Sequence, residues 1–489
     1  MQYSFTLEED DDSDDSEFSC LSEEDFDIED EDEDYELEDI VWKSVQRKSV
    51  RSSWLPKFGL KTGPSNFDFT SLDQPIKYFM LIFPEDLIRS LTKWTQERAL
   101  ETIDVEKKKT QKKGKWNDLT LSEMKCFIGC IMTMGIVRLP NLKMYWQKTT
   151  RLFNVTGIHE LFTMTRFQDI MSCFCMRDPK LDTSSDPLEK INPVVIPIIS
   201  NSQFYYTPKQ ALSIDESMIP FAGRSKMKQY ISSKPCKFGL KAYVIAEAES
   251  AYVIKWSLST GRATNCQTGP GAIERIVMNL VEGLEGEGYI IYTDRHYLSI
   301  PLFKALKKDK IGACGTIMQN RLRLSQEAST KIDAINLQEI QYFSTSSMIL
   351  SVWKDHRNVF VLSNFHIPGE VTKERRIKKK EISQEKTSVT ETVSIPISIM
   401  DYNTHMGGVD TFDQVASYYV PDIKSRRWYM RVFYHLLEIA FNNSYILYRQ
   451  TLQKENRKFL DRLEYRKSII RELVSERRNE KNTPCTEKK

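Results

Sequence analysis

The sequence lacks the features of a secreted, disulfide-stabilised or membrane-spanning protein. Its nine cysteines are sparse for 489 residues and include no Cys-x-x-Cys pair, which argues against a disulfide scaffold and a cysteine-rich zinc module. The longest apolar stretch, Phe127 to Val137, has 11 residues, whereas a membrane-spanning helix needs about 20. The N-terminus is acidic where a signal peptide needs a basic start and an apolar core. We therefore expect an intracellular protein with reduced thiols and no membrane partner.

Positive charge is missing from the first forty residues, which hold 21 aspartates and glutamates but no lysine or arginine. The rest of the chain has 47 acidic and 69 basic residues, so the net charge of +1 hides a body with a surplus of 22 positive charges. A strongly basic body favours a polyanion such as DNA as the partner and argues against an ordinary metabolic enzyme.

The acidic segment contains too few apolar residues to offset the entropy of ordering the chain. We therefore expect residues 1–55 to form a disordered acidic tail. Two roles for this tail remain open. It could keep the protein soluble, or it could compete with DNA for the basic body.

Hydrophobic spacing divides the remaining chain into segments. Residues 56–195 have a helical pattern, and Thr120 or Ser122 before Glu123 resembles the capping box that begins a helix. Residues 196–320 contain short apolar runs with the period of strands, interrupted by two amphipathic helices, in the order β-β-β-α-β-α-β. This order predicts an α/β unit, with strands at 212–216, 241–247, 252–256, 289–292 and 311–317 and helices at 272–282 and 299–308.

The C-terminal third is more irregular. Residues 353–363 predict one or two strands, and the basic run 373–381 is typical of a nuclear-import or phosphate-contact segment. From residue 401 a glycine-containing turn leads into a long helix that begins near Trp428. Residues 451–489 form a charged helical tail in this interpretation.

Acidic residues stand near the ends of two predicted strands, at Asp215 and Asp294. Carboxylates from neighbouring strands, joined by a third acid, are what two divalent cations need for phosphoryl transfer. Asp410 and Asp413 are spaced i, i+3, so they would face the same way on a helix that begins there. On spacing alone this pattern is also common among acids in ordinary loops.

Several blocks of the sequence resemble the piggyBac transposase family. The resemblance covers residues 67–450, and its most specific motifs are Asp-Glu-x-x-Ile-Pro-Phe-x-Gly-Arg and Gly-Gly-Val-Asp-x-x-Asp-Gln. The blocks are LTLSEMKCFIGCIMTMGIVRLPNLKMYWQ (119–147), SIDESMIPFAGRSKMKQYISSKPCKFGLKAYV (213–244), YTDRHYLSIPLFKAL (292–306), GTIMQNR (315–321) and DYNTHMGGVDTFDQVASYYVPDIKSRRWYMRVFYHLLEIAFNNSYILYR (401–449).

The resemblance implies a ribonuclease-H-like α/β core that is split by an insertion. The helical domain at 56–195 would serve DNA binding and dimerisation, the core would run through 196–320 and 401–450, and the insertion would be 321–400. The resemblance also implies a catalytic, metal-binding set of Asp215, Asp294 and Asp410 for Mg²⁺ or Mn²⁺. Asp413 matches a further functionally important acid. Trp428 matches a position linked to DNA handling, although it suits an anchor for the long helix at least as well.

The same resemblance implies a nuclear transposase that acts on DNA as a homodimer. Its chemistry would be strand cleavage at transposon ends through a hairpin intermediate, followed by insertion at TTAA sequences. The alternative is a domesticated DNA- or chromatin-binding protein in which the catalytic fold is weak or inactive.

Two departures from the family bear on this choice. The second acidic motif reads Asp294-Arg295-His296-Tyr297 where the family has Asp-Asn-Phe-Tyr, so a cation stands next to an expected metal ligand. Such a cation could pair with the carboxylate or repel the metal. After residue 450 the only cysteine is Cys485, so we do not expect the family's C-terminal zinc module or a zinc site.

Overall fold

The computed structural model describes residues 41–45, 54–110, 116–147, 157–181, 186–232, 236–261, 271–378 and 388–482. Most of the predicted acidic tail lies outside these ranges. The expected disorder is wrong for residues 41–45 and for Trp54 and Leu55, since Trp54 donates to the Asn364 carbonyl and Leu55 packs against the core. Strand β1 (Lys43–Ser44) pairs antiparallel with β10 (Ile340–Ser344), and Trp42 is buried with its indole N–H donating to the Leu322 carbonyl at 2.8 Å. A buried, hydrogen-bonded indole fixes this segment on the core.

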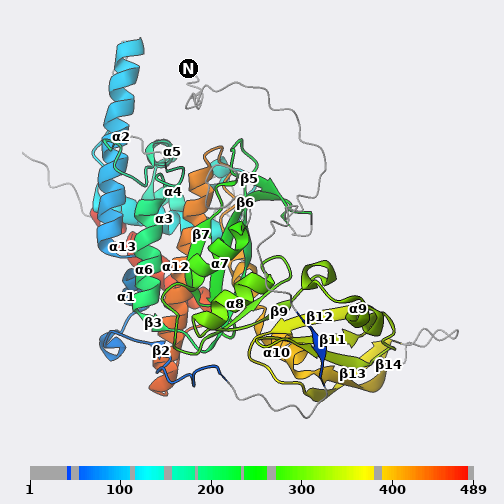
Figure 1. Ribbon diagram of the computed structural model, residues 1–489. Helices are drawn as coiled ribbons and strands as arrows, with labels where there is room; N and C mark the ends of the chain where they lie inside the picture. Colours follow the sequence, from blue (N-terminus) through cyan, green and yellow to red (C-terminus); the bar gives the residue numbers. More distant parts are fainter. Residues whose placement is uncertain are drawn as a thin grey trace, which may run out of the picture.

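The predicted helical region forms a layer of helices along one side of the molecule (Figure 1). Thr120 caps α3 as expected, because its side chain accepts a hydrogen bond from the Glu123 amide at 3.1 Å. The structure gives these helices as α1 (Pro75–Ile82), α2 (Glu85–Thr110), α3 (Leu121–Ile136), α4 (Ile158–Leu161), α5 (Met164–Cys173) and α6 (Asn192–Phe204), with 3₁₀ turns at Phe69–Ser71 and Leu142–Trp146.

The predicted β-β-β-α-β-α-β order is confirmed. Its elements are β4 (Ala211–Pro220), β6 (Phe238–Glu247), β7 (Val253–Leu258), α7 (Ala272–Val281), β8 (Ile290–Thr293), α8 (Ile300–Lys308) and β9 (Gly312–Thr316). They form the central part of one sheet in the order β7-β6-β4-β8-β9, and a short strand β5 (Lys228–Tyr230) also pairs with β6. Strands β4, β8 and β9 run parallel, whereas β6 is antiparallel to β4. A second small sheet pairs β2 (Gly63–Pro64) with β3 (Tyr206–Thr207).

The segment 321–400 extends the sheet instead of standing apart from it. Its strand β12 (Asn358–Ser363) pairs antiparallel with β9, and β11 (Ile349–Lys354) and β10 follow. The predicted strand region 353–363 is thus two strands. Beside them lie a 3₁₀ turn (Gln319–Leu322) and α9 (Gln326–Asp333).

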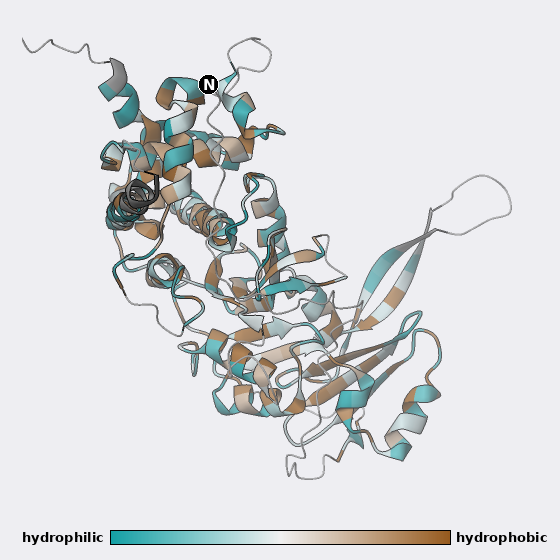
Figure 2. Ribbon diagram, turned by 90° about the horizontal axis from the view of Figure 1, so that it is seen from above, coloured by the Kyte–Doolittle hydropathy of each residue, from teal (hydrophilic) through white to brown (hydrophobic). Residues whose placement is uncertain are grey.

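A two-stranded ribbon of β13 (Glu370–Lys378) and β14 (Ser388–Pro396) carries most of the basic run. Figure 2 shows this ribbon projecting from the rest of the molecule. Residues 373–378 of the basic run lie in β13, and 379–381 lie outside the described residues.

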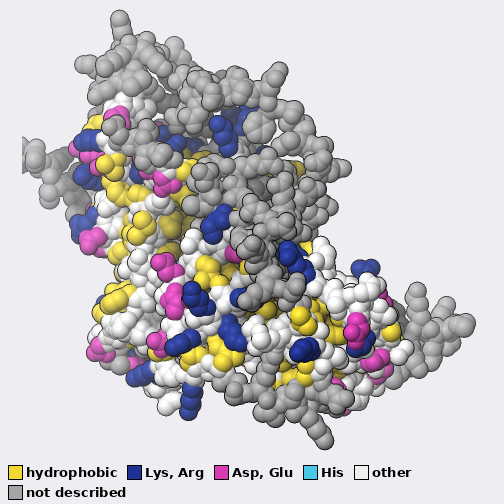
Figure 3. All heavy atoms as spheres, viewed as in Figure 1, with side chains coloured by type: hydrophobic (Ala, Val, Ile, Leu, Met, Phe, Trp, Pro, Cys, Tyr) yellow, Lys and Arg dark blue, Asp and Glu magenta, His cyan; other side chains and the backbone are white. Residues whose placement is uncertain are grey.

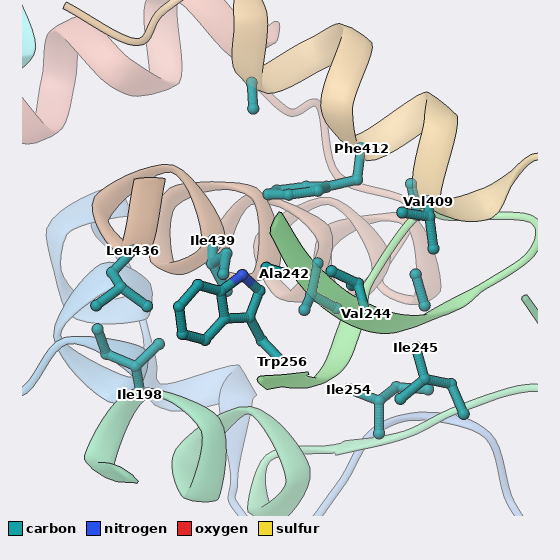
Figure 4. Packing of buried hydrophobic residues seen from close by; sticks show 14 of the residues in the cluster. Ile198, Ala242, Val244, Ile245, Ile254, Trp256, Val409, Phe412, Leu436 and Ile439 are labelled. Carbon is teal, nitrogen blue, oxygen red and sulfur yellow. The ribbon is translucent and has the colours of Figure 1, made fainter. Parts of the chain in front are cut away.

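After the ribbon, the chain returns to the core through α10 (Ile397–His405), α11 (Gly408–Ser417) and the long, mostly buried α12 (Trp428–Lys454). Val409 and Phe412 of α11 lie over Ala242 and Val244 of β6, and α12 passes beside them (Figure 4). The last helix, α13 (Arg462–Asn482), packs along α3, where a Cβ on Gly129 would lie 2.9 Å from Val474. Its buried residues Tyr465, Ile469 and Leu473 make it part of the core and not a free tail.

Candidate functional site

The register of the central strands places Asp215 and Asp294 at neighbouring positions. The parallel pairing of β4 with β8 ends at Ile214 opposite Thr293, and Asp215 and Asp294 are the next residue of each strand. The prediction of adjacent parallel strands is therefore confirmed. Asp215 does not end its strand, however, because β4 continues to Pro220 along β6. Only its pairing with β8 stops there.

Helix α11 packs on β4, and of its two acids it is Asp413 that contacts this strand. A Cβ on Gly408 would lie 2.4 Å from the Ser213 hydroxyl, so the start of α11 touches β4. One turn further along, the Ser217 hydroxyl donates to Asp413. Ser213, Asp215 and Ser217 alternate along β4 and therefore share one face. Asp410 is exposed on the flank of α11.

The surroundings of Asp294 show why a cation would be favourable there. Burial raises the pKa of the Asp294 carboxyl, and the negative charge of Glu216 raises it further. The His296 amide donates to Asp294 Oδ1 at 2.8 Å, and Tyr297 donates its hydroxyl to Glu216 Oε2 at 2.7 Å. The sequence did not predict that Glu216 lies near Asp294. Alternation along a strand assigns Glu216 to the face opposite Asp215.

Two further groups lie close to these carboxylates. Burial raises the pKa of Tyr402 in α10 to about 12, and the charges of Asp294 and Asp215 contribute to the rise. Burial lowers the pKa of the His296 imidazole, and its Nε2 is buried without a hydrogen-bond partner in the described part of the chain. The carboxylate oxygens are donors of the type that suits Mg²⁺ or Mn²⁺, whereas a neutral imidazole is more typical of ions such as Zn²⁺.

The carboxylates are too far apart to form a complete metal site. In the described ranges, no group of three or more histidine, cysteine, aspartate or glutamate side chains is close enough to hold a metal ion. The donors therefore fit Mg²⁺ or Mn²⁺ by chemical type, and side-chain movement would be needed to enclose the ion.

The side chain of Arg295 is exposed and forms no ion pair with Asp294 or any other described residue. Its backbone carbonyl accepts from Arg321 Nη1 at 2.9 Å, which holds the loop that follows Asp294. The cation next to the second acid therefore leaves the Asp294 carboxylate available.

Trp428 lies at the first position of α12 and packs, half-buried, against the core. The residues beside it join distant parts of the fold. Arg427 donates to the carbonyls of Met171 and Ser172 in the α5 region, and Arg431 donates to the Pro220 carbonyl at 2.8 Å. This placement agrees with a helix anchor, and a role of Trp428 in DNA handling stays a prediction.

Comparison with known proteins agrees with this arrangement. A family model described as "Transposase IS4" matches residues 74–445, which is well over half of the chain. Human PiggyBac transposable element-derived protein 3 is 25% identical over 425 residues, which are 85% of this chain and 67% of that protein. The chain belongs to the piggyBac-type transposase family. Human PiggyBac transposable element-derived protein 2 is 24% identical over 434 residues, which are 87% of this chain and 70% of that protein.

The fold is also that of this family. The structure of a piggyBac transposase synaptic complex with hairpin DNA matches with a TM-score of 0.73 and 22% identity, over 88% of this chain and 86% of that chain. The predicted mixed α/β fold with a ribonuclease-H-like core is thus confirmed for this piggyBac-type chain. None of its described helices is long and apolar enough to cross a membrane.

Replacing Asp294 by asparagine should stabilise the metal-free protein at neutral pH. Because the folded protein raises the pKa of this carboxyl, it binds the proton more readily than the unfolded chain does. The native carboxylate therefore lowers stability as the pH rises through the interval between the usual aspartate pKa and the raised one. We expect Asp294→Asn to increase the thermal midpoint at pH 7, and the increase should shrink as the pH falls below the usual aspartate pKa, where the carboxyl becomes protonated in both states.

Added Mg²⁺ should raise the thermal midpoint of the native protein more than that of Asp294→Asn, so that the native protein becomes the more stable of the two. The exposed Asp333 at the end of α9 supplies a control, since Asp333→Asn should change neither the midpoint nor its response to Mg²⁺. Thermal scans from pH 3.5 to 8, with and without the ion, measure both effects. Equal protection of native protein and Asp294→Asn by Mg²⁺ would exclude Asp294 as a ligand.

Proposed function

We propose that this chain binds DNA and uses Asp215, Asp294 and Asp410 with Mg²⁺ or Mn²⁺ for strand cleavage and transfer at TTAA sites. The observation that carries the proposal is the parallel register of β4 and β8, which makes Asp215 and Asp294 neighbours. Helix α11 then lies across β4 with Asp410 and Asp413. Strands and a helix that are packed in this way can hold catalytic groups more rigidly than loops.

In this proposal each residue has a separate role. Asp215, Asp294 and Asp410 would hold the metal, which supplies positive charge for phosphoryl transfer. Asp413 positions α11 through its hydrogen bond with Ser217. The exposed Arg295 could bind a DNA phosphate through its planar guanidinium, which suits bidentate contacts with phosphate oxygens.

DNA as the partner rests on charge and on the relatives. The body has the surplus of 22 positive charges noted above, and basic side chains are spread over the face shown in Figure 3. The matched transposase structure is a complex with hairpin DNA. We propose nuclear localisation from the basic run 373–381 and a homodimer from the family.

A second candidate function is DNA binding without cleavage. It is favoured by the absence of a three-ligand cluster in the described residues and by the His296 amide that occupies Asp294 Oδ1. In that case the ribonuclease-H-like core would be a scaffold of a domesticated protein.

A nicking assay separates the two functions. Supercoiled plasmid with TTAA sites would be incubated with Mg²⁺ or Mn²⁺ and the native chain, Asp215→Asn or Arg295→Asn. Because a metal contributes several kcal/mol to phosphoryl transfer, Asp215→Asn should be slower by at least about 10²-fold. Arg295→Asn restores the family residue and should stay within a few-fold of the native rate, since Arg295 does not pair with Asp294.

The other outcomes have distinct meanings. Nicking by Arg295→Asn alone would identify Arg295 as the lesion and support the domesticated protein. If none of the proteins nicks DNA although all bind it, cleavage is excluded and the second candidate remains. Equal nicking by native protein and Asp215→Asn would indicate a contaminating nuclease and contradict the proposed site.

A further inference from the structure

The segment that connects β4 to β6 has an unusual composition. Residues 221–246 contain six lysines and arginines and no aspartate or glutamate. Within it, β5 forms a short hairpin with the beginning of β6, and β5 lies at the end of the strand order. Figure 1 shows this hairpin at the end of the sheet that lies away from the insertion.

Two large aromatic side chains lie side by side on the surface of this hairpin. Tyr230 is 42% exposed and Phe238 is 56% exposed, and the two residues are opposite each other in the register of β5 and β6. Their ring centroids are 4.8 Å apart. Edge strands usually expose charged residues, so a solvent-exposed aromatic pair at this place calls for a partner that covers it.

The charges around the pair indicate an anionic partner. Lys228 Nζ lies 5.8 Å from the Phe238 ring centroid. Arg224, Lys226, Lys228 and Lys237 are all exposed, and none of them forms an ion pair with a described residue. Aromatic faces combined with unpaired cations are the means by which proteins bind single-stranded nucleic acid, because bases stack on the rings and phosphates meet the cations.

The hairpin is also aligned with the carboxylates. Phe238 and Val244 are six residues apart on β6 and therefore share a face, and Val244 is the register partner of Asp215. At about 3.3 Å per residue, the aromatic pair lies roughly 20 Å along the strand from Asp215. A Cβ on Gly223 would lie 3.0 Å from the Arg426 carbonyl, so the loop before β5 also touches the Arg426–Trp428 segment.

We propose that the β5–β6 hairpin is a binding site for unpaired single-stranded DNA. Bases stack on Tyr230 and Phe238, and Arg224, Lys226, Lys228 and Lys237 contact the phosphates. This inference rests on the proposed DNA-binding function and adds the place where a strand separated from its complement is held. Phe238 lies on the face of β6 that also carries Val244, the register partner of Asp215, so a strand bound at the hairpin would lie on the same side of the sheet as this carboxylate.

Fluorescence anisotropy on the full chain tests the proposal, with a labelled single-stranded oligonucleotide and the same sequence as a duplex. The variants are Tyr230→Ala, Phe238→Ala and the two tryptophan substitutions, Tyr230→Trp and Phe238→Trp, which keep a stacking face. Each alanine variant should weaken single-strand binding by at least about 5-fold and change duplex binding much less, and each tryptophan variant should bind like the native chain.

One matched control and one further variant complete the experiment. Phe204 at the end of α6 is 53% exposed, so Phe204→Ala removes an aromatic of similar exposure from another place and should have no effect. Lys226→Gln with Lys228→Gln should lower the slope of log K against log salt by about 0.7 for each lost phosphate contact.

Each failure has its own signature. Unchanged single-strand affinity in both alanine variants, with duplex binding intact, overturns the hairpin site and leaves the proposed function standing. If the native chain binds neither form of DNA, the proposed function fails and the hairpin site fails with it. If the alanine variants lose dimerisation in sedimentation runs without DNA, the pair belongs to an interface between two copies, and the proposal is wrong.

Discussion

Replacing Arg466 by methionine is expected to lower the free energy of unfolding by about 3–5 kcal/mol, because it leaves a buried carboxylate without its partner. Arg466 in α13 is fully buried. Its Nη1 donates to Glu438 Oε1 at 2.9 Å and its Nη2 donates to Glu438 Oε2. The guanidinium also lies 3.9 Å from the ring centroid of Phe441 and 4.4 Å from that of Tyr419. The pair joins α13 to α12.

The pH dependence of this loss follows from Glu438. Burial raises the pKa of its carboxyl even though Arg466 lowers it, so removal of Arg466 raises this pKa further. In Arg466→Met the carboxyl can escape the cost of a buried charge by binding a proton. The loss of stability should therefore be largest at neutral and alkaline pH and smaller in acid.

Urea unfolding, followed by tryptophan fluorescence, measures the effect. The double variant Arg466→Met with Glu438→Leu should recover most of the lost stability, since replacing both members of a buried pair by apolar residues is often neutral. Arg457→Met, which removes an exposed arginine paired with Glu455, should change little. A neutral single variant would show that the ion pair does not hold α13 on the core.

Replacing Gly408 by alanine should displace α11 from the sheet and impair the candidate site, whereas the same change at Gly407 should be harmless. A Cβ on Gly408 would lie 2.4 Å from the Ser213 hydroxyl and 2.9 Å from the Glu247 carbonyl. A Cβ on Gly407 would meet no atom within 4 Å. Overpacking of this kind costs about 1–3 kcal/mol.

Activity should fall together with stability. Asp410 and Asp413 follow Gly408 on the same helix, so a shift of α11 moves both relative to Asp215. A displacement of about 1 Å can cost 10²-fold in rate, and we expect a loss of that size in the nicking assay. Hydrogen exchange in α11 and β4 gives a readout that does not depend on activity. Equal nicking rates and equal hydrogen exchange in Gly407→Ala and Gly408→Ala would show that activity does not depend on the close approach of α11 to β4.

Local patterns predicted much of the fold correctly because local interactions decide those features. Thr120 caps α3 through a hydrogen bond to a residue three positions away. Except for the short β5, the strands and helices between 211 and 316 follow from hydrophobic period alone. The neighbouring positions of Asp215 and Asp294 do not follow from chain order, because β6 and β7 lie between β4 and β8 in the sequence; only the resemblance to the family implied that the two acids lie together.

Contacts between distant segments were not predictable in the same way. Trp42 was assigned to the acidic tail by composition, yet its ring is buried and it hydrogen-bonds to Leu322, 280 residues away. Composition describes α13 as a charged tail, but the few apolar residues on one side of it complete the packing of α3. The proximity of Glu216 to Asp294 depends on how the loop after β8 folds, which strand alternation does not encode.

The sequence by itself determined the family, the order of the core elements and the basic body, and it selected four aspartates as candidates for the site. These depend on motifs and on periodicities of two and 3.6 residues, which are properties of neighbouring positions. Only the tertiary structure decided that Arg295 faces solvent, that α11 closes on β4 at Gly408, and that Tyr230 and Phe238 form an exposed pair. The direction of a side chain is set by the packing of segments far apart in the chain, and no local pattern records that packing.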